Sequence, residues 1–263
     1  MRIITTINLT YLLTIPVLTP CLIASDSMSQ GRPAQSAELV RKSTEAQGGI
    51  DNLRAIRSLR MTGQIALPPV DEGGGPAPKI AVPWMPVTIL MKRPNFARLE
   101  VDVGGQAIVS ILDGAKAWST KPGSASFDEI SQEGVAGLMS ALLNGITEIG
   151  RPLESYNETG DPIELIGTER EGNRDLYKLK VIRRGGDSMN VFLDKVNFLK
   201  VKQSEIYKEL DLDTYYGDYK AVGDVVLPHY LEHRAIGNQT YSKIKIEKFE
   251  LNTDIEDSRF KRR

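Results

Sequence analysis

The feature that most constrains the fold is an alternation of apolar and polar residues that starts at Ser58 and continues almost to the C-terminus. Apolar side chains occupy every second position in 59–67, 87–91 and 97–103. This period is typical of strands with one buried face. Further extended segments, separated by turn residues, follow at 174–183, 188–194, 198–206, 212–221, 225–236 and 240–251. The pattern predicts an antiparallel meander, and about ten such strands must curl toward a barrel or split into a sandwich.

Two segments interrupt the strand pattern. Residues 67–86 are rich in Pro and Gly, which predicts a loop, and this loop ends at the bulky side chains of Trp84 and Met85. Residues 128–147 instead have a helical period, because their apolar positions are three or four residues apart and so predict an amphipathic helix. We expect this helix to cover the mouth of the curved sheet or to fill its hollow. Its apolar residues are Val135, Leu138, Met139, Leu142, Leu143 and Ile146.

The N-terminal residues 1–25 have the layout of a secretory signal peptide. Arg2 precedes a long apolar stretch that ends in small residues before Asp26, as export signals do. The alternative is a permanent membrane anchor, which Pro16 and Pro20 disfavour because they would break a spanning helix. We therefore expect an exported, periplasmic protein.

Cys21 allows a second interpretation of how this region is processed. The sequence Leu18-Thr19-Pro20-Cys21 loosely matches the lipobox of bacterial lipoproteins, in which the cysteine carries the lipid that tethers the protein to a membrane. Pro20 stands where the lipobox has a small residue. The alternative is cleavage near Ala24, which removes the cysteine and leaves a mature chain without thiols, as suits an oxidising compartment.

After the signal, we expect a linker at 26–35 and one folded domain over 36–263. The domain should open with helical residues 36–56, with Ser36 as the N-cap. Gly48-Gly49 should end the first helix, because Gly readily adopts the left-handed conformation found at helix ends, and a short second turn follows.

Composition excludes several classes of function. The formal net charge of −1 provides no field to gather nucleic acid. A single cysteine excludes a disulfide framework and a zinc site built on cysteines within one chain. We expect no cofactor. Because there are only two histidines, an enzyme would have to rely on carboxylates.

The strongest motif for an enzyme is His229-Tyr230-Leu231-Glu232-His233, which has the H-x-x-E-H pattern of inverted zinc peptidases. On a helix, the two histidines would share one face and hold zinc, with Glu232 as the base. The sequence around the motif predicts a strand instead, which would separate the histidines by about 13 Å. A zinc hydrolase stays an alternative, and we expect the protein not to be an enzyme.

Several segments between about residues 38 and 260 follow one another in a characteristic order. They are ELVRKSTEAQGGIDNLRAIRSLRMTGQI, MKRPNFARLEV, ILDGAKAW, LYKLKVIRRGGDSMNVFLDKVNFLKVK, YYGDYKAVGDVVLPHYLE and IEKFELNTDIEDSRF. In this order the segments resemble the outer-membrane lipoprotein carrier family, the LolA/LolB-like lipoprotein-sorting proteins. The long loop at 67–86 departs from the family pattern. None of the arginines is aligned with the arginine that latches the lid in the family.

The resemblance implies a mainly β (α+β) fold, a strongly curved, incompletely closed antiparallel sheet with helices on its concave face. It also implies that the protein binds lipid or lipoprotein acyl chains in an apolar hollow and transports or sorts them. We further expect a monomer that contacts envelope membrane proteins. The alternative is an envelope scaffold of the same shape whose core is filled by its own side chains.

Several bulky residues are candidates to line such a hollow. Met suits variable chains because its side chain is flexible and polarisable. Each candidate has an alternative role as an ordinary core residue. The candidates are Trp84, Met85, Met91, Trp118, Leu138, Met139, Leu142 and Leu143.

Overall fold

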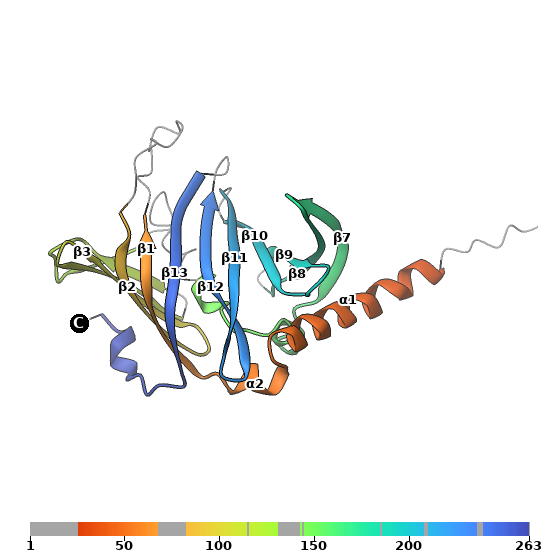
Figure 1. The fold of residues 1–263 in the computed structure, drawn as a ribbon, viewed down its shortest axis with the longest axis horizontal. Helices are drawn as coiled ribbons and strands as arrows, with labels where there is room; N and C mark the ends of the chain where they lie inside the picture. Colours follow the sequence, from red (N-terminus) through yellow and green to blue (C-terminus); the bar gives the residue numbers. More distant parts are fainter. Residues whose placement is uncertain are drawn as a thin grey trace, which may run out of the picture.

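Thirteen strands among the described residues form one antiparallel sheet in the computed structural model of the chain (Figure 1). The structure describes residues 26–67, 83–114, 116–130, 143, 145–184, 186–207, 210–235 and 239–262. The strands of the first half are β1 (Ser58–Ala66), β2 (Met85–Lys92), β3 (Phe96–Val103), β4 (Gln106–Asp113), β5 (Lys116–Thr120) and β6 (Phe127–Glu129). Those of the second half are β7 (Ile163–Glu171), β8 (Arg174–Ile182), β9 (Ser188–Asp194), β10 (Lys200–Tyr207), β11 (Leu210–Val222), β12 (Val225–Ala235) and β13 (Gln239–Leu251).

The sheet consists of two meanders joined at its centre. Its strand order is β6-β5-β4-β3-β2-β1-β13-β12-β11-β10-β9-β8-β7, so β6 and β7 are the two edges. The first strand and the last strand pair with each other, with Leu59 opposite Leu251. The expected mainly β architecture, a curved antiparallel sheet that does not close, is confirmed (Figure 1).

Irregular pairing accompanies the curvature of the sheet. The register shifts between Thr62 and Gly63 on β1, and again within β7, β10 and β12. Such bulges bend a strand and increase its twist. At Gly63 a Cβ atom would lie 2.0 Å from the carbonyl oxygen of Lys245 on β13, so only glycine permits this approach of the two backbones.

Alternation along the strands gives the sheet two differently covered faces. The inner face carries the main inner cluster, which includes Leu59, Ile89 and Leu99, and Leu143, Ile146 and Ile149 pack against it. The outer face carries an outer cluster of Leu90, Ile111, Trp118, Ile255 and Phe260. A 3₁₀ turn, η1 (Asp257–Phe260), places Phe260 there, outside the curve (Figure 1).

The helices lie mainly at one end of the sheet. They are α1 (Asp26–Ala46), α2 (Ile50–Ala55) and the short α4 (Glu154–Glu158). Figure 1 shows α1 beside β7 and extending away from the body of the molecule. Leu39 and Val40 of α1 are buried. None of the helices within the described ranges is long and apolar enough to span a membrane.

The start of α1 differs from the expectation. Residues 26–35, expected to be a linker, are helical, and Ser36 lies inside α1 rather than at its N-cap. The Ser36 hydroxyl instead accepts a hydrogen bond from the backbone N–H of Leu165 at 2.7 Å. The expected stop at Gly48-Gly49 is confirmed, because α1 ends at Ala46 and α2 begins at Ile50.

The segment expected to be a helix at 128–147 is described only at its ends. Asp128 and Glu129 belong to strand β6, so a helix starting at residue 128 is wrong, because this stretch pairs with β5 instead. At the other end, residues 143 and 145–147 are helical. Strand β7 was not predicted from the sequence, since its apolar side chains are few and its outer positions are charged.

Candidate functional site

The inner face of the sheet carries two apolar clusters. The main inner cluster covers the first meander and β11–β13. A second inner cluster joins α1 and the chain around α4 to strands β7, β8 and β9. Its buried members are Leu39, Val40, Leu153, Tyr156, Ile163, Leu179, Val181, Met189, Val191 and Leu193.

Three of the predicted lining residues contribute to the main inner cluster. Met91 and Leu143 are buried in it, with exposed fractions of 1% and 0%. Met85, the first residue of β2, is half-buried against it. Leu138, Met139, Leu142 and Cys21 lie outside the described residues.

The two predicted tryptophans, Trp84 and Trp118, are not part of the main inner cluster. Trp84 is 38% exposed, and the ammonium of Lys245 lies 4.3 Å from the centre of its ring. Trp118 belongs to the outer cluster with Ile255 and Phe260, on the opposite face from Met91. Its neighbour Ala117 faces the main inner cluster. The structure therefore brings Met85, Met91 and Leu143 together and places Trp118 elsewhere.

Arg93 attaches the segment 145–149 to the sheet. This residue follows β2, and its guanidinium donates hydrogen bonds to the carbonyl oxygens of Thr147 at 2.9 Å and Ile149 at 3.1 Å. Burial lowers the pKa of Arg93 from its ordinary value. Sequence reasoning did not assign a role to this arginine, although the Lys-Arg-Pro sequence that holds it belongs to the segments that carried the resemblance.

A group of charged and polar side chains, which we call the polar belt, lies beside these clusters. Tyr156 donates a hydrogen bond to Glu148 at 2.5 Å, and Arg151 forms an ion pair with Glu148 at 3.2 Å. Arg183 pairs with Glu205 at 3.0 Å. Lys200 completes the belt, with its ammonium 4.2 Å from the centre of the Tyr216 ring.

Burial and charge act on the belt in opposite directions. Burial alone would raise the pKa of Glu148, but the nearby positive charges, first those of Arg151 and Lys200, together with the hydrogen bond from Tyr156 hold that pKa below its ordinary value. Burial raises the pKa of Glu205. Burial also lowers the pKa of Lys200 to about 8.

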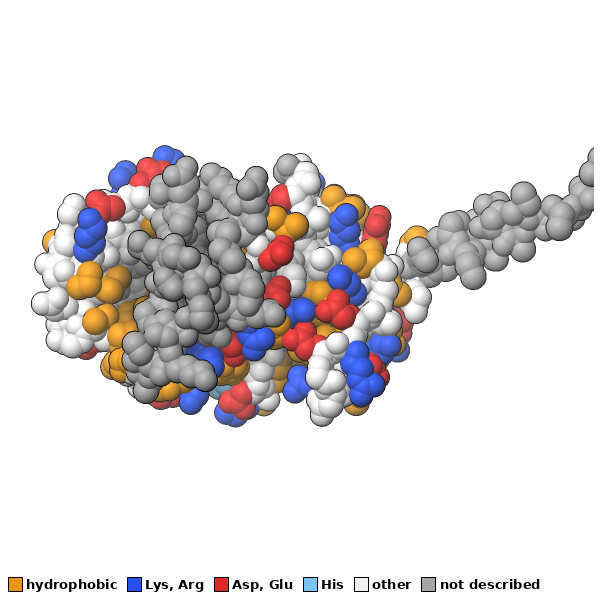
Figure 2. Space-filling view, turned by 90° about the horizontal axis from the view of Figure 1, so that it is seen from above, with side chains coloured by type: hydrophobic (Ala, Val, Ile, Leu, Met, Phe, Trp, Pro, Cys, Tyr) orange, Lys and Arg blue, Asp and Glu red, His pale blue; other side chains and the backbone are white. Residues whose placement is uncertain are grey.

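The belt borders a cavity of about 190 Å³, which we call the polar cavity. Asn95, Leu112 and Gly114 line it from β4 and from two turns of the first meander, while Arg183 and Gln203 line it from the second meander. Thr147, Glu148, Arg151 and Tyr156 complete the wall. Seen from above, charged side chains mix with hydrophobic ones in the half of the molecule next to α1 (Figure 2).

The two histidines lie on strand β12, as the sequence around them predicts. His233 is buried, its Nδ1 atom lies 2.9 Å from the hydroxyl of Ser242, and burial lowers its pKa to about 4. Its Nε2 atom faces Gly145. His229 packs edge-on against Phe249, and Glu232 pairs with Arg234 at 2.8 Å. Within the described residues, no three potential ligands gather as a metal site would require.

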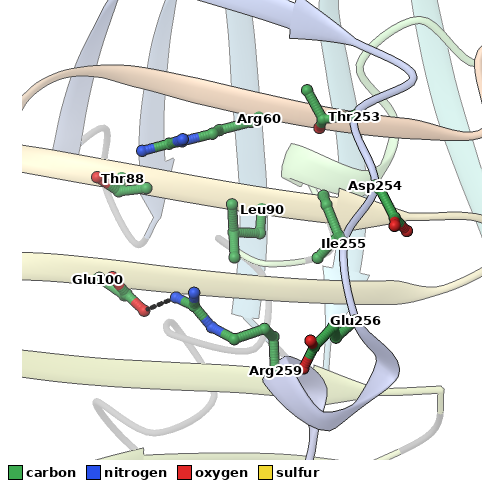
Figure 3. A pocket seen from close by; sticks show the side chains of 9 residues that line it. All are labelled: Arg60, Thr88, Leu90, Glu100, Thr253, Asp254, Ile255, Glu256 and Arg259. Carbon is green, nitrogen blue, oxygen red and sulfur yellow. Dashed lines mark hydrogen bonds and ion pairs between the residues drawn. The ribbon is translucent and has the colours of Figure 1, made fainter.

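A larger pocket of about 540 Å³ lies on the outer face, between β1–β3 and the C-terminal segment (Figure 3). Arg259 reaches across it to Glu100 at 2.6 Å, and Leu90 and Ile255 are the apolar residues in its lining. Such a mixed and largely charged wall does not suit an acyl chain, which loses favourable burial beside polar groups.

Comparisons with known proteins rest on structure rather than on sequence. No protein-family model matches the sequence, and no curated protein matches it. The fold is similar to that of a LolA superfamily protein from Nitrosomonas europaea, with a TM-score of 0.56 and 17% identity over 86% of this chain and 97% of the other.

Two further solved structures have the same fold. One is described as an outer membrane lipoprotein-sorting protein domain, from Vibrio parahaemolyticus, with a TM-score of 0.53, 13% identity and coverage of 87% of this chain and 97% of the other. The other is a DUF1329 family protein from Desulfovibrio piger, with a TM-score of 0.53, 10% identity and coverage of 86% and 97%. The chain therefore has the fold of the LolA superfamily and lipoprotein-sorting proteins.

Proposed function

We propose that this protein is a non-enzymatic carrier that binds a lipid or lipoprotein acyl chain on the inner face of its sheet and works in the periplasm. One observation carries the proposal. The main inner cluster is covered in part by Leu143 and the short segment 145–149, which Arg93 holds through two hydrogen bonds to its backbone.

The physical chemistry of an acyl chain supports this arrangement. Each CH₂ group exposed to water costs about 0.8 kcal/mol, so a carrier must offer apolar surface that can be covered and uncovered. The inner face provides that surface, and a short cover attached by hydrogen bonds can move without breaking the sheet. Release at the destination is then possible without unfolding.

The similarity of fold supports the same class of function, because one of the similar structures is described as a lipoprotein-sorting domain. The sequence of residues 1–25 supports export, and retention of Cys21 would tether the protein to a membrane. A scaffold with a filled core is the second candidate. The complete burial of Leu143 and Ile146 favours it.

Replacement of Ala117 by Phe separates the two candidates. Ala117 is small, buried and part of the main inner cluster, whereas Ala107 on β4 is exposed and provides the matched control Ala107→Phe. In a carrier, the new ring occupies space meant for lipid, so lipid uptake falls while the melting temperature stays near that of the wild type. In a filled scaffold, overpacking destabilises the fold by about 1–3 kcal/mol.

Native mass spectrometry of the protein purified from its own envelope measures uptake directly. We expect a bound mass of lipid size that is lost on denaturation and is reduced in Ala117→Phe but not in Ala107→Phe. A wild type without bound lipid that also takes up none when lipid is added would refute the carrier and favour the scaffold.

A further inference from the structure

The polar cavity is lined by strong hydrogen-bond donors. The guanidinium groups of Arg151 and Arg183 reach it from the segment after 149 and from the end of β8. A guanidinium only donates hydrogen bonds, and its planar fork matches the oxygens of a carboxylate or a phosphate. Both arginines keep part of their side chains accessible, with exposed fractions of 25% and 29%.

The charges around the polar cavity do not balance. Arg93, Arg151, Arg183 and Lys200 are positive, whereas Glu148 and Glu205 are the acidic groups that act on them from inside the belt. Asp187, which is 54% exposed, also pairs with Arg183, and among the described residues of the belt the positive groups still outnumber the negative ones. Excess buried charge is costly unless a partner compensates it.

Two buried polar groups near the belt also lack partners. Gln203, which lines the cavity and is 2% exposed, has no hydrogen-bond partner for its Oε1 atom among the described residues, and the same holds for the hydroxyl of Tyr216. Buried polar groups nearly always have partners. The Oε1 atom of Gln203 accepts hydrogen bonds and so requires a donor, which a water held between it and an anion in the cavity supplies.

We infer that the polar cavity binds an oxyanion, a carboxylate or a phosphate group. If the proposed function holds, on which this step rests, the oxyanion is the head group of a carried amphiphile. The cavity of about 190 Å³ exceeds the 30 Å³ or so that one water occupies in the liquid. It therefore holds such a group with a few waters, but not an acyl chain. Leu112 belongs to both the cavity wall and the main inner cluster, so a chain can continue from the head group onto the apolar face.

Isothermal titration calorimetry with four probes tests the inference. Dodecanoate, dodecyl phosphate and dodecanol share one alkyl chain and differ in head group, and inorganic phosphate has no chain. The full-length mature protein, freed of lipid, is titrated as wild type and as Arg183→Gln/Glu205→Gln. The double variant removes an ion pair as a unit, so that no unpaired buried carboxylate remains. Glu205→Gln alone and the exposed Arg174→Gln are the controls.

We expect the wild type to bind dodecanoate and dodecyl phosphate at least about tenfold more tightly than dodecanol, since charge-assisted hydrogen bonds exceed neutral ones in strength. This preference should disappear in Arg183→Gln/Glu205→Gln. It should persist in Arg174→Gln, and it should persist or grow in Glu205→Gln, which leaves the cavity more positive.

Other outcomes separate the two proposals. Equal binding of all three amphiphiles, or a preference that survives Arg183→Gln/Glu205→Gln, would overturn the oxyanion site and leave the carrier function standing. Failure of every amphiphile to bind would refute the carrier function. If inorganic phosphate then still binds to the wild type and not to the double variant, the oxyanion site is supported with a free ion as its ligand. If phosphate does not bind either, both proposals fail.

Discussion

Arg93 provides the sharpest test of how the inner face is covered. Its guanidinium donates two hydrogen bonds to the backbone of the segment 145–149, at Thr147 and Ile149. A hydrogen bond from a charged donor contributes about 1.5 kcal/mol at the lower end of its range. Loss of both hydrogen bonds in Arg93→Met should therefore favour opening of the segment by about 3 kcal/mol, which raises the population of the open state roughly a hundredfold.

Hydrogen exchange measures this opening directly, because local opening sets the exchange rate of protected amides. The amide of Ile149, which donates to the carbonyl oxygen of Ile146 at 3.1 Å, is the reporter. We expect this amide to exchange about a hundred times faster in Arg93→Met. The increase should be smaller in Arg93→Lys, which keeps the positive charge but lacks the planar guanidinium group. Arg57→Met, at an exposed arginine just before β1, is the control. Unchanged exchange in Arg93→Met would mean that apolar burial alone holds the segment, and the reasoning would be refuted.

Three further predictions concern stability. His233 stays neutral in the fold because burial lowers its pKa from 6.5 to about 4. As the pH drops from about 6.5 to 4, the unfolded chain takes up the proton first, so the free energy of unfolding should fall by about 3 kcal/mol. This fall should be absent from the pH dependence of unfolding of His233→Gln. Phe260→Ala should lower the free energy of unfolding in urea by about 3 kcal/mol or more and shift the fluorescence emission of Trp118 to longer wavelength. An unshifted emission would show that η1 does not cover the outer cluster. Gly63→Ala should destabilise the fold by at least about 2 kcal/mol, because the added Cβ meets the Lys245 carbonyl; a melting temperature equal to that of the wild type would contradict this contact.

The strands could be predicted from the sequence because their signal is local. Alternation of side chains and Gly-rich turns located most of the extended segments between Leu59 and Leu251, with β6 and β7 as exceptions, and the same reasoning placed His229 and His233 on a strand. Side chains alternate between the two faces along a strand, so the position of a residue in the strand decides which face it occupies. Ala117 and Trp118 illustrate this, since they are neighbours on β5 and face opposite sides of the sheet.

The candidate site could be predicted only in part, because much of it is assembled from distant positions. Glu148, Arg183 and Lys200 lie in separate segments of the sequence and meet only when the second meander folds beside the segment after Leu143. No local period marks such a group. The start of α1 was missed for a related reason, since the hydroxyl of Ser36 is used by Leu165, far along the chain.

The pairing of β1 with β13 has a consequence for the order of folding. Each meander is built from neighbours in sequence, so its hairpins can form as soon as the chain supplies them. The central seam, where Leu59 meets Leu251, must wait for the final strand and carries a large loop-closure entropy. A ribosome that still holds the last segment therefore keeps the two halves apart. The inner face forms as a single surface only when the whole chain has been delivered.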